Sequence, residues 1–235
     1  MHAARWDRMR WLIVVILLVL ALPTAAQGQW EKDPATGCMV WTANPVPNQV
    51  VQWSGRCVDD KARGRGKATW SLGDNDKEVL SYYVGQMEGG KRHGAGSQYF
   101  ADGTRYYGEY QNNIPHGFGI YTAPDGSRYE GKYFEGKMHG VGVRTFPDGN
   151  WYEGQFVDDK MHGIGVFHYQ NGNRYEGPFE NGEPHGIGTA FYTNGNRYKG
   201  PFVHGKMHGI GSCLRDDETW GRCEWDNGEF VRWVE

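Results

Sequence analysis

The chain has 235 residues, a net charge of −3, 36 glycines and 34 tryptophan, tyrosine and phenylalanine residues. So much glycine argues against a helical bundle, because each interior glycine weakens a helix by about 1 kcal/mol. The many aromatic residues argue against a disordered chain, the lack of glycine at every third position excludes collagen, and the slight negative charge excludes a strongly basic nucleic-acid binder. The composition is typical of short strands joined by tight turns.

Residues 1–26 have the layout of a secretory signal peptide. Three arginines precede an apolar run from Trp11 to Leu22, and small residues follow at 24–26. The run is short for a membrane span of about 20 residues. We expect cleavage after Ala26 and export to the periplasm or beyond, with an uncleaved N-terminal membrane anchor as the alternative. Residues 27–235 carry 22 Lys+Arg and 27 Asp+Glu, a net charge of −5.

A 23-residue repeat fills most of the chain. The triplet Tyr-x-Gly begins at Tyr83, Tyr106, Tyr129, Tyr152, Tyr175 and Tyr198. The motif His-Gly-x-Gly keeps the same spacing and begins at His93, His116, His139, His162, His185 and His208. Because a fixed period of this length is typical of repeat architectures, we expect one structural unit per repeat.

Each unit contains two turn signals. One is Asp-Gly or Asn-Gly, and the other is a pair such as Asn112-Asn113 or Asn181-Gly182 between the two motifs. These residues tolerate the positive φ angles of hairpin turns. Two turns per repeat leave two strands of about 5–7 residues, so we predict an all-β, elongated, single-layer antiparallel solenoid of β-hairpins. Alternation places Tyr152, Gly154 and Phe156 on one face.

The ends of the array depart from the pattern. Residues 27–52 lack the repeat and form an N-terminal cap segment, with a turn expected at 44–48 between two short strands. The repeat array spans 53–230, with a degenerate first unit at Trp53-Ser54-Gly55 and a degenerate last unit at 220–223, and residues 231–235 form a C-terminal tail. Extra residues around 74–81 interrupt the period after the first unit.

The four cysteines lie in these end units. They are Cys38 and Cys57 near the start of the array, and Cys213 and Cys223 near its end. In an oxidising compartment an even number predicts disulfides. Three pairings are open; we favour the two local ones, because the ends of an elongated protein lie far apart. A zinc site is the alternative.

The motifs resemble a known family. Tyr-Glu-Gly-x-Phe at 152–156, Gly-Lys-Met-His-Gly-x-Gly at 136–142 and the closing Asp/Asn-Gly are similar to the MORN repeat. The resemblance covers about 53–230 and implies a single-layer solenoid of hairpins. It does not imply one activity: members contribute to protein–protein interaction, dimerisation and phospholipid contact.

The sequence gives little support for catalysis or metal binding. The repeated histidines would lie about 10 Å apart along a sheet, too far to share one zinc ion, and we expect them to hydrogen-bond local backbone. The sequence contains no phosphate-binding loop, Gly-x-Ser-x-Gly or Cys-x-x-Cys motif. We therefore expect no enzyme, no cofactor and no metal site.

Two repeated surfaces are candidates for binding. The aromatic ladder is either the packed face of the sheet or a groove for a partner, and its residues are Tyr106, Tyr129, Tyr152, Phe156, Tyr175 and Tyr198. A row of basic residues could contact anions such as lipid phosphates, or it could be a charge-balanced surface; its candidates are Lys91, Lys137, Lys160 and Lys206.

Together these features predict a non-catalytic scaffold at the cell envelope that binds a protein through a concave aromatic face. A phospholipid-binding module at the membrane surface and a glycan-binding module of the cell wall are the alternatives. We expect no nucleic-acid partner. A homodimer through the terminal edge strands is a further expectation, because the sheet does not close.

Overall fold

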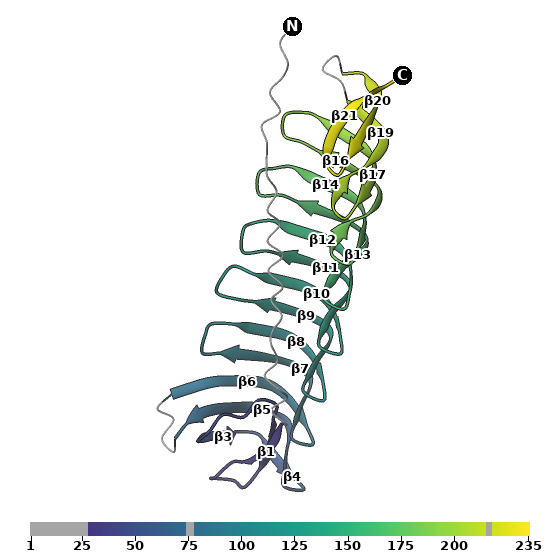
Figure 1. Cartoon of the computed structure of the whole chain (residues 1–235). Coiled ribbons are helices and arrows are strands. Elements are labelled where there is room, and N and C mark those ends of the chain that lie inside the picture. Colours follow the sequence, from purple (N-terminus) through teal and green to yellow (C-terminus); the bar gives the residue numbers. More distant parts are fainter. Residues whose placement is uncertain (1–27, 74–77, 215–217) are drawn as a thin grey trace.

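The computed structural model describes residues 28–73, 78–214 and 218–235. The expected signal peptide at 1–26 lies outside the described residues, as do residues 74–77 of the expected interruption. In the part of the chain that is described there is no helix, and 21 strands form one open sheet of antiparallel hairpins (Figure 1). The predicted all-β hairpin solenoid is confirmed.

The first six strands form the N-terminal end of the sheet. They are β1 (Gln29–Lys32), β2 (Met39–Thr42), β3 (Gln49–Trp53), β4 (Arg56–Val58), β5 (Lys61–Leu72) and β6 (Glu78–Glu88). Strands β1 and β2 pair with each other, while β3, β4 and β6 all pair antiparallel with the long strand β5. The interruption after the first unit thus lengthens the β5–β6 hairpin, which pairs as far as Leu72 and Glu78.

The remaining strands follow the 23-residue period. They are β7 (Lys91–Phe100), β8 (Arg105–Gln111), β9 (Ile114–Thr122), β10 (Arg128–Phe134), β11 (Lys137–Thr145), β12 (Trp151–Val157), β13 (Lys160–His168), β14 (Arg174–Glu180), β15 (Glu183–Pro184), β16 (Gly186–Phe191), β17 (Arg197–Val203), β18 (Lys206–Met207), β19 (Gly209–Leu214), β20 (Trp220–Asp226) and β21 (Glu229–Val234). The tyrosine-bearing strands of the central repeats have 7 residues, and the returning strands β9, β11 and β13 have 9.

The short turns between paired strands adopt the left-handed backbone that their residues allow. Asn112 and Asn113 have φ angles of 51° and 73°, and Glu135 and Gly136 have φ angles of 50° and 82°. Two successive positive φ angles match the right-handed twist of the flanking strands. The turn chemistry therefore sets the register of each hairpin.

In four of the repeats a bulge interrupts the hairpin beside the histidine motif. In β11 the glycine that follows His139, Gly140, has a φ of 65°, and the pairing register between β10 and β11 shifts between Gly131 and Tyr133. Bulges of this kind bend a strand and increase its twist. Partly buried side chains such as Met138 and Phe146 pack against the tyrosine-bearing face, where the hydrophobic core lies.

Disulfides join the end units as the local pairing predicts. Cys38 bonds Cys57, and Cys213 bonds Cys223. The degenerate first unit also follows the repeat, because the Trp53 ring covers Gly55 and Gly66 at the spacing that each tyrosine uses later in the chain.

Candidate binding surface

The six repeat tyrosines occupy one buried position. Tyr83, Tyr129, Tyr152, Tyr175 and Tyr198 are at most 2% exposed, and Tyr106 is 6% exposed. Each hydroxyl donates a hydrogen bond to the backbone carbonyl three residues later, for example from Tyr152 to Gln155 O at 3.0 Å. These bonds satisfy the one polar group that each ring buries.

Each tyrosine ring lies flat over two glycines on paired strands. Gly154 and Gly165 are directly opposite each other, and a Cβ on either would lie 2.3 Å from the Tyr152 hydroxyl. Residues with side chains cannot occupy these positions without moving the ring. The tyrosine ring therefore requires glycine at both paired positions of the two motifs.

A second aromatic residue joins neighbouring repeats; it lies four positions after every repeat tyrosine except Tyr83, where Met87 occupies this position. Phe156 packs edge to face against Tyr152 of its own repeat and against Tyr129 of the preceding one, with ring centroids 5.1 Å apart in both pairs. The same pattern links Phe179 to Tyr175 and Tyr152. Such contacts contribute about 0.5–1.5 kcal/mol each beyond the area they bury.

This packing corrects the expected aromatic groove. The rings proposed to receive a partner, at positions 106, 129, 152, 156, 175 and 198, form the continuous core of the solenoid and are at most 6% exposed. Burial also raises the pKa of Tyr83, Tyr129, Tyr152 and Tyr198 to about 12, because the phenolate would lose its hydration. Of the two interpretations of the ladder, the packed face is the one that the structure supports.

The opposite face of the sheet, the outer face, carries a row of exposed apolar side chains. We call it the apolar row; it consists of Phe118, Val141, Ile164, Ile187 and Ile210, which are 45% to 65% exposed. All five occupy the third position of His-Gly-x-Gly. The sequence analysis missed them, although the same position is apolar in five consecutive repeats.

Neighbouring strands interleave other side chains with the apolar row. Lys132 pairs with Phe118, and Gln155 pairs with Val141. Further along, Pro178 pairs with Ile164, and by the same register Pro201 pairs with Ile187. At the end of the row Ile210 pairs with Glu224, so the row has apolar partners at Ile164 and Ile187 and polar partners on either side of them.

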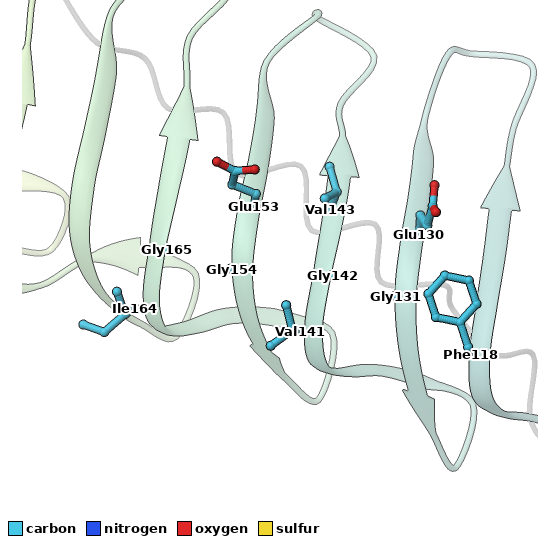
Figure 2. A pocket seen from close by; sticks show the side chains of 10 residues that line it. All are labelled: Phe118, Glu130, Gly131, Val141, Gly142, Val143, Glu153, Gly154, Ile164 and Gly165. Atoms are coloured by element: carbon cyan, nitrogen blue, oxygen red, sulfur yellow. The ribbon is translucent and has the colours of Figure 1, made fainter.

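Carboxylates lie beside the central part of the apolar row. Figure 2 shows Phe118, Val141 and Ile164 on one side of a band of bare glycine backbone and Glu130, Val143 and Glu153 on the other. These residues line a shallow depression of about 490 Å³. Glu130 forms an ion pair with Arg128, and Glu153 lies 3.9 Å from His168.

The lysines proposed as anion contacts are not alike. Lys137 lies 3.6 Å from Asp158 of the next repeat, and the Lys91 ammonium lies over the Trp41 ring at 5.5 Å. Lys160 and Lys206 are exposed. The structure places all four after hairpin turns, at the start of returning strands, and it leaves anion binding there a prediction.

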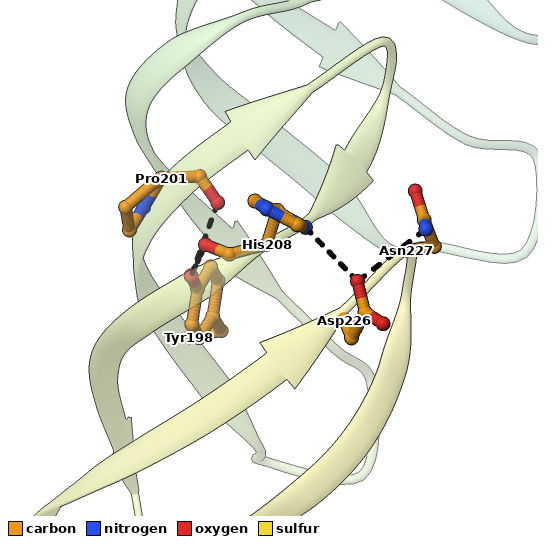
Figure 3. A network of polar contacts seen from close by, with 5 residues as sticks. All are labelled: Tyr198, Pro201, His208, Asp226 and Asn227. Atoms are coloured by element: carbon orange, nitrogen blue, oxygen red, sulfur yellow. Dashed lines mark hydrogen bonds and ion pairs between the residues drawn. The ribbon is translucent and has the colours of Figure 1, made fainter.

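The side chains of the repeat histidines contact carboxylates and aromatic rings. His93 and His185 each lie 3.6 Å from the glutamate five residues earlier, in contrast to the expected side-chain bonds to backbone. In the last repeat the Tyr198 hydroxyl lies 3.1 Å from Pro201 O and 3.4 Å from His208 O, and His208 Nδ1 lies 3.3 Å from Asp226 (Figure 3). Within the described ranges, no three His, Cys, Asp or Glu side chains are grouped so as to hold a metal ion.

Comparison with known proteins identifies the repeat. No curated protein matches the chain. Among solved structures, the wild-type TCP10 domain of Danio rerio CPAP is similar at 13% identity and a TM-score of 0.36, covering 81% of this chain and 97% of that one. The SAS-4 TCP domain of Drosophila melanogaster, solved with a proline-rich motif of Ana2, has 14% identity and a TM-score of 0.31 and covers 59% and 80%. At such scores the likeness says nothing about the partner of this chain.

The family model of the MORN repeat matches six consecutive segments. They are residues 83–105, 106–128, 129–151, 152–174, 175–197 and 198–219. The six segments begin at the six buried tyrosines and cover more than half of the chain. The chain belongs to the MORN-repeat family.

Proposed function

We propose that this protein is an exported, non-catalytic scaffold at the cell envelope that binds a protein partner along its apolar row. MORN repeats suggest a repeat scaffold for protein or membrane interaction. The observation that carries the choice of surface is the exposure of Phe118, Val141, Ile164, Ile187 and Ile210 at equivalent positions of successive repeats. Scattered exposed apolar residues are ordinary, but exposed apolar side chains at the same position of five successive repeats favour an interaction site.

The apolar row contributes little to the stability of the fold. Ile164 is 65% exposed, whereas the tyrosine on the other face of the same hairpin, Tyr152, is 0% exposed and fully packed. An exposed β-branched residue suits a strand, but threonine would suit it as well without offering an apolar surface to water. A partner that covers the apolar row supplies a reason for isoleucine and valine there.

Export is supported by two observations. The structure contains two disulfides, which persist in oxidising compartments. The layout of residues 1–26 is that of a signal peptide, although this segment lies outside the described residues. In the described part of the chain no helix has the length and apolarity to span a membrane.

A phospholipid partner is the second candidate, and the exposed lysines Lys160 and Lys206 favour it. Residues 27–235 have a net charge of −5, so long-range attraction to an anionic bilayer is absent. A lipid partner predicts flotation with anionic vesicles that high salt abolishes. A glycan partner predicts retention on peptidoglycan, now through exposed rings such as Tyr107 and Phe118 on the outer face.

Site-specific photo-crosslinking in cells tests the proposal. A photoreactive side chain is placed at position 164 of the apolar row or, as a control, at position 157, where Val157 is also exposed but stands next to a turn. We expect a discrete protein adduct from position 164 and none from position 157. Equal adducts at both positions, or none at either, would contradict a protein partner on the apolar row.

A further inference from the structure

We propose that the apolar row binds a proline-rich segment in the polyproline II conformation, lying along the long axis of the sheet, with every third residue against one row residue. The inference rests on the proposed function and names the chemistry of its partner. It follows from the spacing of the row, from the donors between its members and from the carboxylates beside it.

The spacing of the apolar row is set by the strand geometry. Its members lie on β9, β11, β13, β16 and β19, and one tyrosine-bearing strand separates each from the next. Two strand steps correspond to about 9.4–9.8 Å. A ligand running across the strands therefore meets one apolar side chain every 9.4–9.8 Å or so.

Polyproline II is the regular backbone conformation that matches this distance. Its three residues per turn rise about 9.3 Å, so every third side chain points in the same direction at nearly the spacing of the row. The mismatch accumulates to at most about 2 Å over the four intervals. A ligand of about 13 residues would place five side chains on the five members of the row.

Other regular conformations do not match. In an α-helix one step of the row corresponds to about 6.4 residues, so successive steps meet different faces of the helix. In an extended strand three residues rise about 10 Å, but side chains alternate, and every third residue points to the opposite side. A ligand in either form would contact only some members of the row.

The outer face also supplies what a polyproline II backbone lacks. Such a backbone makes no internal hydrogen bonds, so its carbonyls need donors. Lys132 and Gln155 stand between the row residues Phe118, Val141 and Ile164. Gln155 Oε1 accepts a hydrogen bond from Ile164 N at 3.0 Å, which leaves the amide N–H groups of that side chain to donate to the ligand.

The carboxylates beside the apolar row favour basic residues at the ligand positions that do not contact the row. The carboxylates of Glu130 and Glu153 lie on one side of the row, across the glycine band (Figure 2). Both side chains are partly exposed, with 41% and 51% of their surface accessible. Glu130 is already ion-paired with Arg128, so a lysine or arginine of the ligand that points to Glu153 would meet an opposite charge. The favoured ligand is therefore proline-rich, with an apolar residue at every third position and basic residues between.

Synthetic peptides test the inference directly on the full-length protein. The probe is a 13-residue peptide made of Leu-Pro-Lys repeats with a final leucine, and the control has the same composition with no two leucines three positions apart. A third peptide carries the same charge on an amphipathic helix. Binding is measured by fluorescence anisotropy, together with a series of shorter and longer Leu-Pro-Lys peptides.

We expect the periodic peptide to bind at least tenfold more tightly than both controls, with affinity rising up to about 13 residues and then levelling off. The substitution Ile164→Lys should weaken binding at least tenfold, and Val157→Lys should leave it unchanged, with the same melting temperature for both variants. Equal binding of the shuffled or helical peptide, or no binding of the periodic peptide, would overturn the inference. Either result leaves the protein adduct at position 164 as the separate test of the proposed function.

Discussion

The Tyr152 ring lies directly over Gly165 on the paired strand, so that a Cβ on this glycine would lie 2.3 Å from the tyrosine hydroxyl. The same relationship recurs along the array, from Trp53 over Gly66 to Tyr198 over Gly211. The 23-residue period is therefore the period of one ring on one pair of glycines. The aromatic ring and the two glycines of each repeat therefore depend on one another.

Replacing Gly165 with alanine should destabilise the protein by about 1–3 kcal/mol, because the added methyl group displaces a fully buried ring. Urea unfolding measures the loss. In a Tyr152→Ala background the ring is absent, so the same glycine change should cost clearly less. Equal costs in both backgrounds would show that the ring does not require the glycine.

The tyrosine hydroxyl contributes to the free energy of unfolding separately from the ring. Tyr152→Phe removes the hydrogen bond to Gln155 O and should cost about 1 kcal/mol. Tyr107→Phe is the matched control, since Tyr107 lies on the outer face and is 61% exposed, and it should change the unfolding free energy by less than about 0.5 kcal/mol. A neutral Tyr152→Phe variant would contradict the role of the buried hydroxyl.

Alkaline pH should unfold the protein cooperatively. The pKa of Tyr83, Tyr129, Tyr152 and Tyr198 is about 12 in the folded chain, against an ordinary value of 10.0. The unfolded chain therefore releases protons first. The stability from these groups is complete below pH 10 and is lost as the pH rises through 12. Circular dichroism and tyrosinate absorbance should change together; tyrosinate appearing in a fully folded protein would contradict this.

Loss of the C-terminal disulfide should loosen only the end of the array. The bridge between Cys213 and Cys223 spans a sequence separation of 10, and its removal by the double change to serine should cost about 3 kcal/mol in that unit. In repeat proteins each unit contacts only its neighbours, so protection in the central repeats should persist. Hydrogen exchange resolves the two regions, and uniform loss of protection along the array would contradict a local role.

The sequence was sufficient to predict the hairpins, the turns, the sharing of faces and the disulfide pairs, because each depends on local spacing. Alternation assigned Tyr152, Gly154 and Phe156 to one face. It could not show which face is covered, since both carry apolar residues. That outcome depends on the bulge at positions such as Gly140, which bends the hairpin, and on edge-to-face contacts between repeats such as that of Tyr129 with Phe156. The aromatic face that was expected to receive a partner is the covered one.

The most direct test compares one change on each face of the same hairpin. The two variants are Tyr152→Phe and Ile164→Lys. For each we would measure the melting temperature and the adduct that forms with a photoreactive group at position 141. The account predicts that Tyr152→Phe lowers the melting temperature and keeps the adduct, whereas Ile164→Lys keeps the melting temperature and loses the adduct. Loss of the adduct in Tyr152→Phe with retention in Ile164→Lys would contradict the assignment of the two faces.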